Sequence, residues 1–70
     1  MKFVECEGKP VLINLASVDC IEVAAGYGEY YVRANVSDNR WYNLYTGNEE
    51  NCLVYLRDLV RDMVEAGLIV

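Results

Sequence analysis

The stretch GYGEYYVRANVSDNRWYNLY, residues 26–45, decides the fold. It holds five of the six tyrosines and the only tryptophan of the 70-residue chain. Turn-forming residues at 26–28 and 37–39 bound two runs, EYYVRANV (29–36) and RWYNLY (40–45), in which the character of the side chain alternates from one position to the next. Short alternating runs rich in aromatic and β-branched residues predict β-strands, here a pair joined by a tight turn.

Upstream of this stretch, the same alternation predicts three more strands. They are KFVECE (2–7), PVLINL (10–15) and VDCIEVA (18–24). Gly8-Lys9 fits a two-residue hairpin turn with glycine at its first position, and Ala16-Ser17 leaves room only for a brief connection. Connections this short favour a meander, so four or five strands within residues 2–45 are expected to form an antiparallel sheet.

Downstream, the sequence predicts one helix over about residues 47–66. Thr46-Gly47-Asn48-Glu49 matches a capping box, in which the threonine accepts a hydrogen bond from the first turn and the glutamate reaches back. Apolar residues then recur at helical spacing up to Gly67, the expected left-handed C-terminal cap. The fold class is therefore α+β, a single small domain over residues 1–70 with the sheet packed on one C-terminal helix.

The predicted helix has more apolar surface than one sheet requires. Its apolar arc is roughly 180° wide, whereas a surface helix needs a stripe of only about 100°. The surplus lies on one flank, at Leu53, Val60 and Val64. This flank is expected to bury either a sheet edge or another molecule.

The strand pattern predicts a second apolar surface on the far side of the sheet. Tyr30, Val32, Ala34 and Val36 alternate with Tyr31 and Arg33, and form the better core face. If Tyr42 and Leu44 also join the core, the far face receives a set of large side chains: Tyr31, Arg33, Trp41, Tyr45, Leu12 and one aliphatic pair from 18–24. Aromatic residues are common in half-buried strands whatever the function of the protein. A patch of this size, however, exceeds what a soluble monomer usually exposes.

These two surfaces predict an interaction module. Tyrosine, tryptophan and arginine are enriched at the centres of protein interfaces. We therefore expect a non-enzymatic protein that binds itself, as a homodimer, or another protein. The candidate interface residues are Tyr31, Arg33, Trp41, Tyr45, Leu53, Val60 and Val64.

Composition argues against catalysis, cofactors, metals and nucleic acid. The chain has no histidine, and no serine, cysteine or lysine stands beside an evident base, so neither acid–base nor nucleophilic catalysis is expected. A zinc site would need all three cysteines and a carboxylate, and no phosphate-loop spacing surrounds the GYG at 26–28. The net charge of −5 repels phosphate backbones.

The cysteines and the N-terminus indicate a cytoplasmic protein. Cys6, Cys20 and Cys52 are odd in number and widely spaced, as expected of buried free thiols in a reducing compartment rather than a disulfide framework. Glutamates interrupt any apolar core of a signal peptide, and no apolar run is long enough to span a membrane.

Two other functions compete with self-association. An acidic protein could occupy a basic groove of a nucleic-acid-handling complex, and the carboxylates for such inhibition would be Glu5, Glu7, Asp19, Glu22 and Glu29. Alternatively, a small ligand could bind in a pocket between Tyr27, Tyr30 and the helix.

The stretch GKPVLINLASVDCIEV (8–23), followed by a hairpin and the LYTGNEE (44–50) helix entry, resembles a pattern found in very short bacterial and prophage-encoded proteins of unknown function. Small flagellar-operon proteins are among them. The resemblance covers roughly residues 8–60 and depends on Gly8, Asn14, Val18, Ile21 and the strand–strand–helix order. It implies a sheet-plus-helix fold and transfers no functional residue. Small phage inhibitors of host defence, such as anti-CRISPR proteins, are similar in size and charge.

Overall fold

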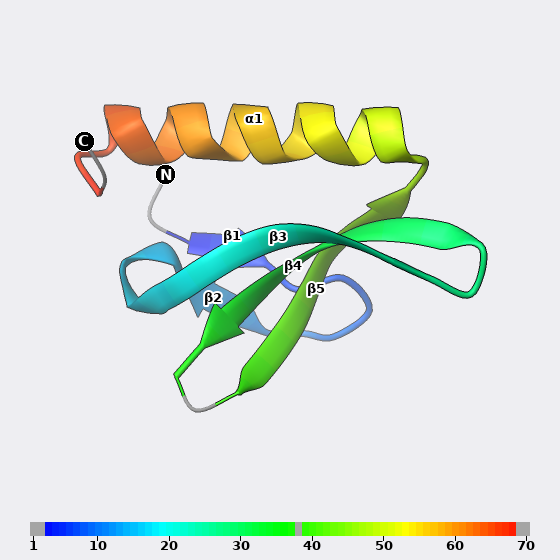
Figure 1. Ribbon diagram of the computed structural model, residues 1–70. Coiled ribbons are helices and arrows are strands. Elements are labelled where there is room, and N and C mark those ends of the chain that lie inside the picture. The colour runs from blue at the N-terminus through cyan, green and yellow to red at the C-terminus, as the bar shows by residue number, and fades with distance from the viewer. Residues whose placement is uncertain (1–2, 38, 69–70) are drawn as a thin grey trace.

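The chain forms an α+β fold, as predicted, in a computed structural model that describes residues 3–37 and 39–68. One C-terminal helix, α1, spans Glu49–Glu65, and a short 3-10 helix, Leu15–Ser17, lies between the second and third strands (Figure 1). The strands are β1 (Phe3–Glu5), β2 (Leu12–Asn14), β3 (Val18–Gly26), β4 (Glu29–Val36) and β5 (Arg40–Gly47).

The five strands are antiparallel and divide between two sheets. β1 and β2 form a hairpin, and β3, β4 and β5 form a three-stranded meander in that order. The division occurs at Asn14, whose side-chain oxygen accepts a hydrogen bond from the backbone N–H of Ala16 at 3.0 Å and so starts the 3-10 turn. Because this turn redirects the chain after β2, β3 does not continue the first sheet.

The turn of the β1–β2 hairpin is longer than the sequence predicted. β1 ends at Glu5 and β2 begins at Leu12, so residues 6–11 form the connection. Within it, the N–H of Cys6 donates to the carbonyl of Val11 at 2.9 Å, and the N–H of Lys9 donates to the carbonyl of Cys6 at 3.5 Å. Gly8 adopts a positive φ of 76° within it, which a glycine tolerates without strain. The predicted two-residue turn at Gly8-Lys9 is therefore wrong.

The β3–β4 turn does have two residues. Tyr27 and Gly28 both have positive φ, 55° and 77°, as a type I′ turn requires. Such a turn matches the twist of the flanking strands, and β4 accordingly begins at Glu29, as predicted. The expected turn at 37–39 includes Asp38, which lies outside the described residues.

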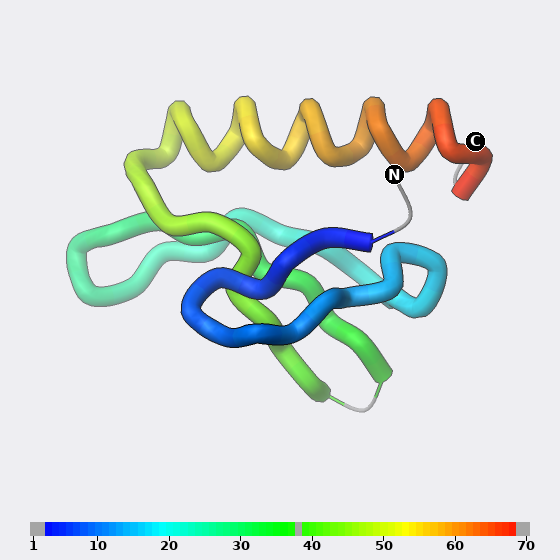
Figure 2. The backbone as a smooth tube through the Cα atoms, turned by 180° about the vertical axis from the view of Figure 1, so that it is seen from behind, coloured from blue at the N-terminus to red at the C-terminus, as the bar shows by residue number. Residues whose placement is uncertain are grey.

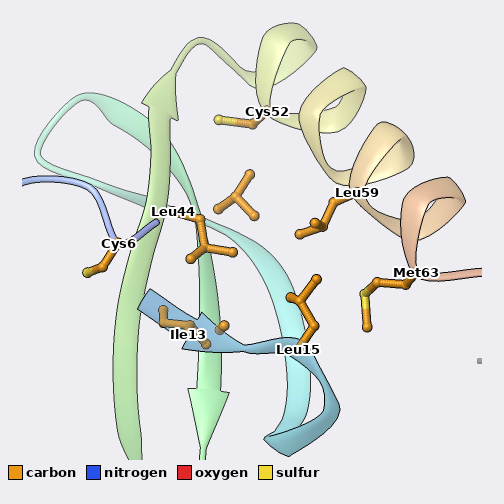
Figure 3. Close-up of a cluster of buried hydrophobic side chains, with 9 residues drawn as sticks. Cys6, Ile13, Leu15, Leu44, Cys52, Leu59 and Met63 are labelled. Atoms are coloured by element: carbon orange, nitrogen blue, oxygen red, sulfur yellow. The ribbon is translucent and has the colours of Figure 1, made fainter. Parts of the chain in front are cut away.

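Two elements cover the same face of the three-stranded sheet, here called the inner face. Figure 2 shows the β1–β2 hairpin lying across this sheet on the side where α1 also packs. The buried cluster takes Cys6 and Ile13 from the hairpin region, Leu15 from the 3-10 turn, Val32, Ala34 and Leu44 from the meander, and Cys52, Leu59 and Met63 from α1 (Figure 3). The core is therefore closed by the N-terminal hairpin as well as by the helix.

The helix begins two residues later than the capping box indicated. Asn48 is the N-cap, and its side-chain oxygen accepts from the N–H of Asn51 at 2.8 Å. Thr46 instead belongs to β5, so its predicted capping role is wrong. The C-terminal prediction is confirmed, because Gly67 follows the helix with a φ of 77°.

Candidate interaction surfaces

The outer face of the meander, opposite the core, is mixed in polarity. Following the register, it carries Cys20, Glu22 and Ala24 from β3, Tyr31, Arg33 and Asn35 from β4, and Trp41 and Asn43 from β5. Of the five large residues named for this face, three are present, namely Tyr31, Arg33 and Trp41, whereas Tyr45 and Leu12 are not. The face is therefore less apolar than the sequence indicated.

Arg33 is the central residue of the outer face and contacts side chains from all three strands. Its guanidinium carbon lies 4.0 Å from the centroid of the Trp41 ring and 5.9 Å from that of Tyr31. Nε and Nη2 both bind Oε1 of Glu22, which faces Arg33 across the β3–β4 pair, at 2.7 and 2.5 Å. The cation is thus stacked and paired within the chain, and Trp41 keeps 37% of its surface exposed.

Tyr45 does not lie on the outer face, and the prediction that placed it there is wrong. The register moves from Val32–Tyr45 to Arg33–Asn43, so Leu44 is one extra residue in β5, a β-bulge. The bulge turns both Leu44 and Tyr45 towards the core. Tyr45 stacks on Tyr55 of α1 with ring centroids 5.0 Å apart and planes 12° apart.

A second bulge, in β3, removes the predicted aliphatic pair from the outer face. Val18 pairs with Val36 and Cys20 with Asn35, which leaves Asp19 as the extra residue. The prediction of alternating pairs is wrong, because Val18 joins Ile21 and Val23 against the core. Cys20 is exposed as a result, whereas the other two free thiols are buried as predicted.

The remaining predictions for the outer face and the ligand pocket are also revised. Leu12 is 65% exposed, but it belongs to β2 of the other sheet. Tyr27 lines a shallow hollow of about 280 Å³ on the outer face, together with Tyr31, Arg33 and other residues. Tyr30 packs against the core. The predicted pocket between Tyr27, Tyr30 and the helix is therefore not formed.

The apolar flank of α1 does not bury a sheet edge, which was one of the two alternatives that the sequence left open. Leu53, Val60 and Val64 expose 52, 39 and 47% of their surfaces. At 100° per residue they lie within about 40° of one another on the helix surface. We call these three residues the α1 flank.

The opposite side of α1 faces the hairpin. Tyr55, Asp58, Leu59 and Asp62 line a groove of about 160 Å³ that also includes Val4 of β1. Burial raises the pKa of the Tyr55 hydroxyl above its ordinary value of 10, and the negative charge of Glu7 adds to the effect. Because this side already packs on the chain's own hairpin, the α1 flank points away from it.

The acidic residues of the competing hypothesis have different environments. Glu22 is paired with Arg33, and the Glu7 carboxylate accepts hydrogen bonds from the backbone N–H of Thr46, at 3.1 Å, and from its hydroxyl. The exposed carboxylates left for a basic partner are Glu5, Asp19 and Glu29. Inhibition of a nucleic-acid-handling complex thus stays a prediction, carried by fewer residues.

Glu7 has a structural role that the sequence analysis missed. Its backbone N–H donates to the carbonyl of Asn43 at 2.8 Å, and its carboxylate binds Thr46, so it occupies the free edge of β5 at two points. A single glutamate in an alternating run gives no sign of a contact 39 positions away. The matching feature at the other end of the sheet, the uncovered edge of β3, was missed for the same reason.

Comparisons with known proteins add no relative. The chain matches no protein-family model, no curated protein and no solved structure at a significant level. Over residues 3–37 and 39–68, no three cysteine or acidic side chains gather as metal ligands. Within those same ranges, no helix is long and apolar enough to cross a membrane.

Proposed function

We propose that this chain is a non-enzymatic protein–protein interaction module that associates with a second copy of itself through the α1 flank. The observation that carries the proposal is the exposure of three large aliphatic side chains, Leu53, Val60 and Val64, on one side of a helix. Exposed apolar patches rimmed by polar residues typically mark interaction sites. The free thiols favour a cytoplasmic location for the module.

Two further features support this choice over the outer face. Residues 53, 60 and 64 are separated by seven and four positions. These spacings keep the side chains on one side of the helix, as in the contact line between two packed helices. On the outer face, by contrast, Arg33 already stacks on Trp41 and pairs with Glu22. A partner there would have to displace contacts that the chain makes with itself.

Sedimentation equilibrium of the wild type and of Leu53→Lys tests the proposal. We expect the wild type to reach a dimer in the micromolar range, and Leu53→Lys to weaken association at least about tenfold because it buries a charge at the seam. Leu12→Lys is the matched control. It changes a leucine that is at least as exposed, at 65%, but lies on β2, and it should dimerise like the wild type.

Two results would count against this function. A wild type that stays monomeric at hundreds of micromolar would exclude self-association. Equal weakening by Leu53→Lys and Leu12→Lys would show that association does not use the α1 flank.

A further inference from the structure

The two edge strands of the three-stranded sheet, β3 and β5, differ in their hydrogen bonding to the rest of the chain. The β5 edge is occupied by Glu7, which bonds to Asn43 and Thr46. The β3 edge is nine residues long. Apart from Val18, whose N–H donates to the carbonyl of Leu15 in the 3-10 turn, the described hydrogen bonds include none from this edge to another segment. Proteins usually block long free edges because their unpaired backbone groups recruit further strands.

The pairing register identifies which backbone groups of β3 point outward. Gly26 and Glu29 flank a two-residue type I′ turn, so they form a hydrogen-bonded pair. Counting back in twos, Ala24 and Glu22 also bond to β4. Ile21, Val23 and Ala25 then direct their N–H and C=O groups to the free edge.

The free edge and the α1 flank lie on the same side of the molecule. α1 lies over the three-stranded sheet in Figure 1 and contacts all three of its strands, so its two long sides face the β3 edge and the hairpin. The hairpin fills the other side, where Val4 lines the groove with Tyr55 and Asp58. A partner that pairs with β3 therefore also meets Leu53, Val60 and Val64.

We infer that a second copy of the chain adds to the β3 edge, forming a six-stranded antiparallel sheet with the two α1 flanks in contact across a two-fold axis. The inference rests on the proposed function and specifies how the two copies of the dimer are arranged. An antiparallel strand pair is self-complementary, as a two-fold interface requires.

The size and charge of this surface fit a second copy. Nine residues span about 30 Å of edge. A helix about 10 Å in diameter packed about 10 Å above the sheet makes this side roughly 20 Å high, so the patch measures roughly 600 Å², somewhat below the roughly 800 Å² per partner of a standard interface. Each chain carries a net charge of −5, which opposes association. On β3, however, the ion pair with Arg33 reduces the contribution of Glu22 to this repulsion.

The register of the two β3 strands follows from the same charge. A two-fold axis at Glu22 would place the two Glu22 carboxylates directly opposite each other, which is unfavourable. An axis at Val23 places Glu22 opposite Ala24 of the partner copy. It also places Ile21 opposite Ala25 and Val23 opposite itself, so all three outward-bonding residues find partners.

Residue-resolved hydrogen exchange, followed by NMR at low and high protein concentration, tests this geometry. The amides of Ile21, Val23 and Ala25 should be protected only at concentrations where the dimer forms. The amides of Glu22 and Ala24, which bond to β4 within one chain, should be protected throughout and serve as the internal control. A dimer whose outward amides exchange freely at every concentration would overturn the edge pairing and leave the α1 flank as the interface. A monomer at every concentration would overturn the proposed function itself.

A pair of proline variants provides a second test. Ala25→Pro removes an outward N–H, which an edge strand tolerates, and should weaken the dimer at least about tenfold while the monomer stays folded. Ala24→Pro removes an N–H that bonds to β4 and should lower the melting temperature of the monomer. If Ala25→Pro dimerises like the wild type, the edge is not paired. If Ala25→Pro fails to fold, the exchange data on the wild type decide.

Discussion

The two faces of the three-stranded sheet are closed in different ways. The inner face is buried by elements from both ends of the chain, so Leu15 and Leu59 belong to one buried cluster with Val32, which is fully buried. Over the outer face, the described residues place no second layer, and Arg33 instead stacks on Trp41 and pairs with Glu22. Apolar burial thus stabilises the inner face, whereas on the outer face the charge of Arg33 is paired with that of Glu22.

The comparison predicts the largest loss of stability on the inner face. Leu15→Ala removes a side chain that is 2% exposed and leaves a cavity between the 3-10 turn, the sheet and α1. We expect a loss of about 3 kcal/mol in the free energy of unfolding. Urea denaturation measures it, at protein concentrations low enough to keep the chain monomeric.

Leu12→Ala is the matched control for Leu15→Ala. It truncates the same residue type three positions earlier, where the side chain is exposed, and should cost about 0.5 kcal/mol or less. Equal losses in the two variants would mean that the hairpin does not cover the inner face as described.

The sequence was enough to predict the elements and most of the faces. Alternation placed Tyr30, Val32 and Ala34 inside and Tyr31 and Arg33 outside, and the helical spacing of the apolar residues predicted that one face of the helix packs on the sheet. These predictions succeed because burial repeats with the period of a strand or of a helix. The α1 flank was predicted for the same reason.

The failures arise where one residue breaks that period. Asp19 and Leu44 are extra residues in β3 and β5, and each one shifts the alternation, so the strand residues on its two sides no longer share one pattern of faces. A bulge depends on the pairing with the neighbouring strand, which a single strand's sequence does not encode. The same holds for Glu7, whose partner Thr46 is remote in the chain.

At the β5 edge, between the two faces, we expect an intermediate effect. Glu7→Gln keeps the shape of the side chain but replaces a charged acceptor of the Thr46 N–H and hydroxyl. Because the site is exposed, a loss of about 1 kcal/mol is expected. Thermal or urea unfolding measures it, and a double-mutant cycle with Thr46→Val isolates the pair.

Glu5→Gln controls for the loss of one negative charge from the same hairpin. It should change stability by no more than about 0.5 kcal/mol, since Glu5 is an exposed position of β1. A Glu7→Gln variant that unfolds like Glu5→Gln would show that the carboxylate does not hold the β5 edge.

On the outer face, removing the central cation should have a smaller effect. Arg33→Ala abolishes the stacking on Trp41 and the ion pair with Glu22, both of which are partly exposed to solvent. We expect a loss of about 0.5–1 kcal/mol and a shift in the emission of Trp41. Arg40→Ala, an exposed arginine of β5, is the control and should leave the emission unchanged. A loss of several kcal/mol in Arg33→Ala would mean that the outer face contributes to the fold as strongly as the inner one.

The smallest effect at neutral pH is expected for Tyr55→Phe, and it should appear only in alkali. Burial raises the pKa of Tyr55 in the folded chain above 10, so near pH 10 the unfolded chain loses this proton first. The unfolded state then binds fewer protons than the folded state, and stability falls as the pH rises. Melting temperatures of wild type and Tyr55→Phe should therefore run in parallel below pH 10, and the wild type should fall more steeply above it. Tyr27→Phe, at the exposed turn, is the control, and its melting temperature should depend on pH in the same way as that of the wild type. Parallel curves for wild type and Tyr55→Phe up to pH 11 would mean that the hydroxyl, despite the stacking on Tyr45, stays in contact with water.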